Sequence, residues 1–161
     1  INNSIFPPVY NIEYMFDEMD DVDVDFWGVT LFPHLHKEKF LGTRGISEHL
    51  QSYFIVFEKS VILSNAIKDF FSNLDDTNTF KNAVKNGEVA LTTFMKKKGF
   101  SYSPYINECY YLSNYLNNYR LLYDKPATLL YLGSPFVKKK AYEYMNIFEK
   151  QKLDEALNKI N

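Results

Sequence analysis

Two aspartates near the start of the sequence have a spacing that could serve metal chemistry. Asp23 and Asp25 alternate within a segment rich in strand-forming residues, so on a strand both would project to the same side. Carboxylates placed in this way could hold Mg²⁺ or Mn²⁺ together with a diphosphate. Acidic runs are more often solvated surface, and the pattern alone favours a solvated turn between a helix and a strand.

Glu88 follows Asn86-Gly87 and begins the segment 88–98, which has helical spacing and is closed by Gly99. We expect Glu88 in the first turn of this helix, where the helix dipole stabilises an ionised carboxylate. A general base must be ionised to accept a proton. First-turn acids are also common at helix starts for structural reasons, and the pattern alone favours that role.

Histidines and lysines supply two further candidate sites. His34 and His36 have the same-face spacing of a strand and could chelate a metal, but no third ligand follows nearby, and hydrogen-bonding histidines are the favoured interpretation. The turn at Gly133 is followed by three lysines, Lys138 to Lys140, that could meet a phosphate or form the polar face of a helix. None of these features alone defines a reaction.

Apolar spacing and turn residues predict the elements that must position these side chains. The pattern favours helices packed on a few strands, with helix dominant towards the C-terminus. We expect helices over 12–20 (capped by Asn11), 61–74, 79–85 (ended by Asn86-Gly87), 88–98, 109–122, from Pro126 onwards and over 137–160. We expect a buried strand over 26–32, a polar loop over 33–48, the strongest strand over 50–57, and an extended segment over 100–106.

Composition excludes several classes of protein. The 161 residues have a one-domain length, and 46% hydrophobic with 24% charged residues excludes a disordered chain. The net charge of -2 argues against nucleic-acid binding through overall charge. Cys109 is the only cysteine, so an internal disulfide and a cysteine zinc cluster are excluded. No apolar run reaches the roughly 18 residues of a membrane helix. Since the sequence begins with Ile1, we expect a piece of a longer protein.

Five ordered segments resemble those of the rhamnan synthesis protein F family. They span residues 2 to 138, in the order and at the spacing of the family. The matching stretches are Asn2-Asn3-Ser4-Ile5-Phe6-Pro7-Pro8, Asp25-Phe26-Trp27-Gly28-Val29-Thr30, His49-Leu50-Gln51-Ser52-Tyr53-Phe54-Ile55-Val56-Phe57, Glu88-Val89-Ala90-Leu91-Thr92 with Gly99-Phe100, and Pro135-Phe136-Val137-Lys138. Two positions depart from the family: Asn3 replaces an aspartate and Pro7 replaces a glycine.

The resemblance implies a glycosyltransferase of cell-surface polysaccharide assembly. Such a protein moves a sugar, often rhamnose, from a nucleotide-diphosphate donor to a glycan or lipid-linked glycan. The implied fold is α/β, of the nucleotide-sugar transferase (GT-A-like) type. Because the family has a nucleotide-binding half before its first segment, residues 1–161 resemble a single domain that is the C-terminal, acceptor-side part, α+β in character. The implied place is the cytoplasm at the inner face of the membrane, with peripheral contact and no transmembrane segment.

The resemblance also implies roles for particular residues. It makes Glu88 the general base that takes a proton from the acceptor hydroxyl. It places Asn3, Ser4, Trp27, His49, Gln51, Ser52 and Lys138 in donor or acceptor binding, with Arg44 and Lys139 as further candidates for the diphosphate. Gln51 and Ser52 would hydrogen-bond either a ligand or a buried backbone group. Trp27, Tyr53 and Phe54 would either pack against the sugar or fill the core. An acidic turn binds Mg²⁺ or Mn²⁺ in related transferases, and the uncharged Asn3 weakens that expectation.

A binding module without catalysis is the competing interpretation. The missing donor half, Asn3 and a tyrosine stripe within 109–122 all permit a non-catalytic module that keeps the fold of the acceptor half. The stripe, formed by Tyr110, Tyr111, Tyr115 and Tyr119, would then be a partner surface.

Overall fold

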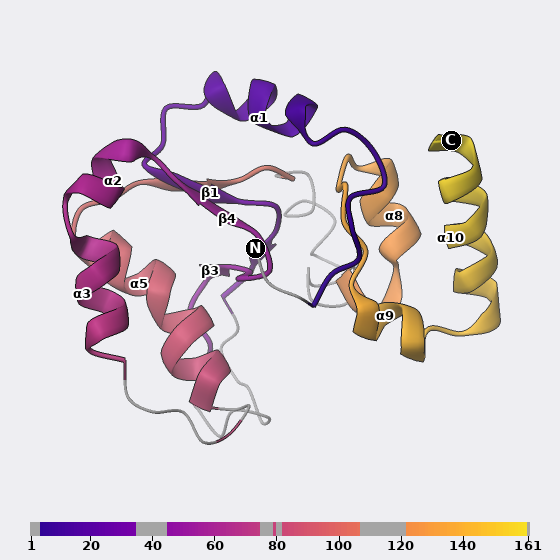
Figure 1. Cartoon of the computed structure of the whole chain (residues 1–161). Coiled ribbons are helices and arrows are strands. Elements are labelled where there is room, and N and C mark those ends of the chain that lie inside the picture. Colours follow the sequence, from indigo (N-terminus) through magenta and orange to yellow (C-terminus); the bar gives the residue numbers. More distant parts are fainter. Residues whose placement is uncertain (1–3, 35–44, 75–78, 80–81, 107–121, 161) are drawn as a thin grey trace.

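The computed structural model describes residues 4–34, 45–74, 79, 82–106 and 122–160. Its larger sheet has three strands, with β1 (Phe26–Gly28) between an antiparallel neighbour, β4 (Ile55–Phe57), and a parallel one, β5 (Tyr102–Pro104). A separate antiparallel pair is formed by β2 (Leu31–Phe32) and β3 (His49–Leu50). The described chain is therefore mixed α/β with short strands and several packed helices, as the sequence predicted (Figure 1).

Helices cover both faces of the three-stranded sheet because side chains alternate along β1. Trp27 packs on one face with Met15 and Met19 of α1 (Glu13–Asp20), whose first turn is capped by Asn11 as expected. Phe26 packs on the other face with residues of α2 (Lys59–Leu63), α3 (Ala66–Ser72) and α5 (Ala90–Lys97). Figure 1 shows α1 above the sheet and α3 and α5 below it.

The expected strands over 26–32 and 50–57 are each divided in two. Gly28 pairs with Ile55, and Leu31 pairs with Leu50. Between these pairs, the two residues 29–30 face the four residues 51–54, so two residues of the second segment have no place in a ladder. Such an excess interrupts strand pairing and turns the backbone. The prediction of one continuous strand over 50–57 was therefore wrong, and residues 51–54 form a bulge.

The expected helix over 61–74 is also divided. Residues 59–63 and 66–72 are separate helices, α2 and α3, because Asn65 has a φ of 62°. This left-handed conformation does not fit a continuous helix, and asparagine adopts it more readily than most residues.

Glu88 does not stand at the start of a helix. The π-helix η1 (Ala83–Val89) runs directly into α5, so the expected boundary at Asn86-Gly87 is absent. Gly87 lacks the positive φ with which a glycine ends a helix. Since the dipole effect fades beyond the first turn, it does not explain the ionisation of Glu88, and that expectation was wrong. π-turns within helices are frequent at functional sites.

The C-terminal part forms a separate group of helices at one end of the molecule (Figure 1). As expected, Pro126 starts a helix, α8 (Pro126–Tyr131). The single helix expected over 137–160 is instead α9 (Lys139–Tyr144) and α10 (Ile147–Ile160). The break occurs because Met145 is extended and the Asn146 side chain caps α10 by accepting the N–H of Glu149 at 3.0 Å. The helix expected over 109–122 lies almost wholly outside the described residues.

Three apolar clusters hold these elements together. One lies between α1 and the sheet, one between the sheet and α2, α3 and α5, and one between α8 and α10 around Leu130 and Leu153. In the described parts of the chain, we find no helix with both the length and the apolar character needed to cross a membrane.

Candidate functional site

The carboxylate of Glu88 lies at the centre of a polar cluster with Ser52, His49 and Lys138, which we call the Glu88 cluster. Ser52, in the bulge, donates a hydrogen bond to Glu88 Oε2 at 2.5 Å. His49, on β3, places its Nε2 3.6 Å from Glu88 Oε1, which is an ion-pair distance rather than a hydrogen bond. The Glu88 side chain remains 22% exposed. The carboxylate is therefore held from two sides and still accessible to a ligand.

The orientation of the His49 ring is fixed by contacts other than the one with Glu88. Its Nδ1 lies 2.8 Å from the carbonyl oxygen of Ser47, and since a carbonyl only accepts, Nδ1 carries a proton. Its ring stacks on Phe32 with centroids 5.0 Å apart, and its side chain is only 3% exposed. These contacts direct Nε2 at the carboxylate. A proton on Nε2 turns the contact with Glu88 into an ion pair.

The neighbours of Glu88 favour its ionised form. Burial acts to raise the pKa of Glu88, but the side chains of His49 and Ser52 and the charge of Lys138 outweigh burial and lower the pKa below its usual range. Glu88 is therefore a carboxylate at neutral pH. The cause is this local set of neighbours and not the end of a helix.

Lys138 brings a positive charge to the same cluster. Its Nζ lies between two tyrosine rings, 5.5 Å from the centroid of Tyr53 and 5.2 Å from that of Tyr123, and donates to the Tyr123 hydroxyl at 3.2 Å. Burial lowers the pKa of Lys138, while the charge of Glu88 acts to raise it. Tyrosine faces stabilise a desolvated ammonium group, so Lys138 is held as a charge close to Glu88.

The start of the chain lies beside Lys138. Ile5 and Lys138 form an isolated antiparallel bridge, and the carbonyl oxygen of Ser4 accepts the N–H of Lys139 at 3.0 Å. Ser4 therefore lies next to the backbone of Lys138 and Lys139. Asn3 and Arg44 lie outside the described residues.

A buried hydrogen-bond network supports the bulge. The Thr30 hydroxyl donates to Gln51 Oε1 at 2.7 Å, and because that uses its only proton, it accepts from the Tyr53 hydroxyl at 2.8 Å. All three residues are almost fully buried. Gln51 is thus part of this buried network, and its hydrogen bond helps to fix the bulge that carries Ser52. Thr92 has a similar role, since its hydroxyl oxygen accepts the N–H of Leu50 at 3.1 Å.

Trp27 lies in the core and not in the cluster. It is 3% exposed and packs against Phe16 and Phe54, with ring centroids 5.3 and 5.9 Å apart. Of the two roles left open for Trp27, the structure shows the packing role. Tyr53, by contrast, packs its ring against the Lys138 ammonium.

The residues expected to bind a divalent ion do not form a ligand set in the described part of the chain. Asp25 has a structural role, because its Oδ2 accepts hydrogen bonds from the N–H and the hydroxyl of Ser101 at 2.7 and 2.8 Å. Asp23 is exposed before the start of β1, so the pair does not stand on a strand. His34 is exposed, and His36 is outside the described residues. Among residues 4–34, 45–74, 79, 82–106 and 122–160, no three His, Cys, Asp or Glu side chains are placed to hold a metal.

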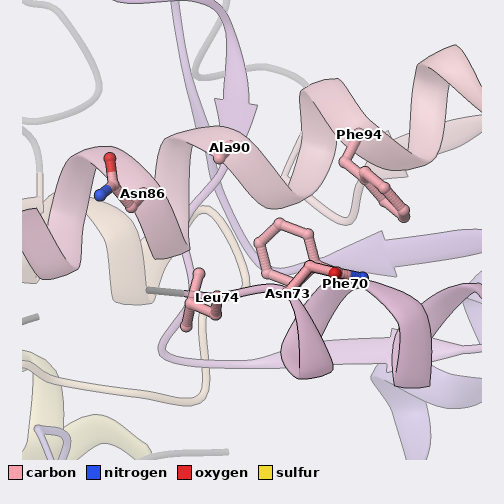
Figure 2. A pocket seen from close by; sticks show the side chains of 6 residues that line it. All are labelled: Phe70, Asn73, Leu74, Asn86, Ala90 and Phe94. Atoms are coloured by element: carbon pink, nitrogen blue, oxygen red, sulfur yellow. The ribbon is translucent and has the colours of Figure 1, made fainter. Parts of the chain in front are cut away.

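Two pockets are lined by residues of the described part of the chain. One, of about 310 Å³, lies between α3 and the η1–α5 helix and is lined by Phe70, Asn73, Leu74, Asn86, Ala90 and Phe94. Figure 2 shows the Phe70 ring between the two helices, with Phe94 to one side and Asn86 and Leu74 to the other. The other pocket, of about 330 Å³, is lined by Tyr123, Asp124, Lys125, Lys140, Ala141, Tyr144, Met145 and Asn146. It shares Tyr123 with the contact to Lys138.

The chain belongs to the rhamnan synthesis protein F family, whose model matches residues 1–160. The resemblance seen in the sequence is thereby confirmed, and with it a link to polysaccharide synthesis. Comparison with curated proteins and with solved structures gave no match. Each of the five family segments supplies a residue at or beside the Glu88 cluster, namely Ser4, Thr30, Ser52, Glu88 and Lys138.

Sequence reasoning missed Tyr123. It continues the spacing of the tyrosine stripe, four residues after Tyr119, so the stripe contained a signal for it. Thr30 and Thr92 stood in quoted family segments but were given no role. In the structure, both are hydrogen-bonding anchors for the segment that carries His49 and Ser52.

Proposed function

We propose that this chain is the acceptor-side part of a glycosyltransferase of polysaccharide synthesis, with Glu88 as general base. The observation that carries the proposal is the Glu88 carboxylate, which is ionised, held by Ser52 and His49, and still 22% exposed. A carboxylate in this state can accept a proton from a sugar hydroxyl.

The proposed step is a displacement at the anomeric carbon of the donor sugar. The acceptor hydroxyl oxygen forms the new bond to that carbon, and the bond from the carbon to the diphosphate oxygen breaks. The hydroxyl proton passes to Glu88, and the electron pair of the broken bond leaves with the diphosphate. Carboxylates serve as bases toward hydroxyl groups that attack anomeric carbons in other sugar-processing enzymes.

Lys138 is the proposed counter-charge for the leaving diphosphate, and His49 is a second candidate to contact it. His49 lies beside Glu88, the charge of Lys138 acts on Glu88, and Lys138 donates to Tyr123, which also lines the 330 Å³ pocket. Fixed positive charge in a partly desolvated site stabilises developing negative charge strongly. We assign the donor to the class of nucleotide-diphosphate sugars and the acceptor to glycans or lipid-linked glycans, handled at the cytoplasmic face of the membrane. The GT-A-like fold and the preceding donor half belong to the same proposal.

Transfer assays with matched variants test the proposal. The longer protein that includes the proposed donor half is incubated with a panel of nucleotide-diphosphate sugars and a polysaccharide-bearing membrane fraction, and sugar incorporation is measured. We expect Glu88→Gln to lower kcat by about a hundredfold to ten-thousandfold, which is the usual contribution of a positioned base. Calorimetric binding of the nucleotide diphosphate should be unchanged in this variant. Glu155→Gln, which removes an exposed carboxylate from α10, is the control. Wild-type turnover by Glu88→Gln would exclude the base role.

Glycan binding without transfer is a second candidate, and the 310 Å³ pocket favours it. Its lining combines the rings of Phe70 and Phe94 with the side-chain amides of Asn73 and Asn86. Aromatic faces bury the apolar side of a sugar, and amides can pair with its hydroxyls. If the protein only binds glycans, Phe94→Ala should abolish glycan binding in calorimetry, while Glu88→Gln should leave it unchanged and no donor sugar should be consumed.

A further inference from the structure

Three large apolar side chains are mostly exposed to solvent where α9 turns into α10. Tyr144 is 78% exposed, Ile147 is 63% exposed and Phe148 is 72% exposed. We call these three residues the α9–α10 tip. Figure 1 shows the connection between the two helices at the outer edge of the C-terminal group. Grouped exposed apolar residues of this size usually mark an interaction surface.

The chain around the tip is basic, although the whole chain has a net charge of -2. Residues 138–152 contain five lysines and two glutamates, a formal charge of +3. One of the glutamates, Glu149, is only 5% exposed and is paired with Lys125 at 2.6 Å and Lys152 at 3.3 Å. Its negative charge is therefore neutralised inside the molecule. Since Lys138 belongs to the Glu88 cluster and Lys152 pairs with Glu149, the surface charge around the tip comes from Lys139, Lys140 and Lys150 against Glu143, and it is net positive.

The tip is continuous with the Glu88 cluster. Tyr144 lines the 330 Å³ pocket together with Lys140 and Tyr123. Tyr123 in turn accepts the hydrogen bond from Lys138, whose charge acts on Glu88. A molecule reaching the pocket from the side of the tip would thus come close to the proposed site of transfer.

We propose that the α9–α10 tip docks on an anionic lipid bilayer, with Tyr144, Ile147 and Phe148 in the interfacial layer. Aromatic and aliphatic side chains surrounded by lysines have the composition of surfaces that lie in the headgroup region. Each lysine near an anionic membrane surface contributes about 1 kcal/mol to binding, which is about a fivefold change in partitioning. The inference deepens the proposed function, on which it rests for the membrane setting, by naming the surface that meets the bilayer. Vesicle binding is measured without any transfer, so the two proposals can fail separately.

Co-sedimentation of the purified protein with vesicles tests the inference. We expect binding to vesicles of phosphatidylcholine mixed with phosphatidylglycerol, and much weaker binding to phosphatidylcholine alone. The double variant Ile147→Ser/Phe148→Ser should weaken partitioning at least tenfold, since it removes two apolar side chains from the interface. Lys139→Gln/Lys140→Gln should weaken it by about 25-fold and reduce its salt dependence.

Ile62→Ser/Leu63→Ser is the matched control. These two residues are 60% and 70% exposed on α2, at the other end of the molecule (Figure 1). The control should bind vesicles like the unmodified protein. Equal loss of binding in the control and the tip variant would overturn the inference, and so would unchanged binding in the tip variant. Absence of vesicle binding, with a dimer in size-exclusion chromatography that Ile147→Ser/Phe148→Ser dissociates, would assign the tip to a second copy of the chain instead.

Discussion

The hydroxyl of Ser52 donates to the carboxylate of Glu88 across 2.5 Å, although 36 positions separate the two residues in the sequence. The contact joins the bulge at 51–54 to the π-helix η1. It fixes one oxygen of the carboxylate and leaves the other facing His49.

Removing that hydroxyl should weaken catalysis without abolishing it. In Ser52→Ala, the carboxylate loses a charge-assisted hydrogen bond, so we expect the pKa of Glu88 to rise and kcat to fall about tenfold. The acidic limb of the pH–rate profile should move to higher pH. The measurement is the pH dependence of kcat/KM, with Ser103→Ala, a serine on β5, as the control. A lower rate with an unmoved pH profile would show that Ser52 acts only on the structure.

Glu88 should also make the protein less stable in acid. Since the pKa of Glu88 in the folded protein lies below the ordinary value of 4.5, the unfolded chain binds this proton more tightly. The stabilisation is therefore present above about pH 4.5 and lost as the pH falls through the lowered pKa. In Glu88→Gln, the free energy of unfolding should fall less steeply between about pH 5 and about pH 3. Urea titrations across this range provide the measurement, and an equal slope in both proteins would contradict the shifted pKa.

The charge of Glu88 should be detectable at Lys138. Burial lowers the pKa of Lys138 and the Glu88 carboxylate opposes this effect, so in Glu88→Gln we expect the pKa of Lys138 to fall further. Titration of the lysine side chains by NMR gives the measurement, and the exposed Lys68 on α3 provides an internal reference. A Lys138 pKa that is equal in both proteins would show that the two charges do not act on each other.

The Thr30 hydroxyl should contribute to stability and not directly to chemistry. Thr30→Val has nearly the same shape but leaves the buried Gln51 and Tyr53 groups without this partner, which should cost about 1–3 kcal/mol of unfolding free energy. Thr93→Val is a suitable control, because its hydroxyl contacts only a carbonyl within its own helix at 3.3 Å. Thermal and urea unfolding provide the comparison. Equal stability of Thr30→Val and the unmodified protein would show that these hydrogen bonds make no net contribution to the free energy of unfolding.

Apolar spacing predicted where the described helices and strand segments lie, though not all of their boundaries, because burial on one face imposes a period on the sequence. It did not predict the division of 50–57 or the turn at Asn65, since both depend on a local backbone conformation that tertiary contacts select. The family segments pointed to Glu88, His49, Ser52 and Lys138, and these residues lie together in the structure. The reason given for the ionisation of Glu88 was wrong, because contacts between residues far apart in sequence determine it. Trp27 could not be assigned to core or ligand from its residue type, which suits both.

The two additional residues at 51–54 have a consequence for how this chain can vary. Shortening this segment by two residues would allow 49–57 to pair continuously with 26–32, as an ordinary hairpin arm. Such a deletion would add ladder hydrogen bonds and remove the turn that carries Ser52 to Glu88. A shortened relative could therefore fold at least as well and lack the Glu88 cluster. Under the proposed function, such a shortening would remove activity by a different route from Glu88→Gln, through the backbone that carries Ser52 to Glu88.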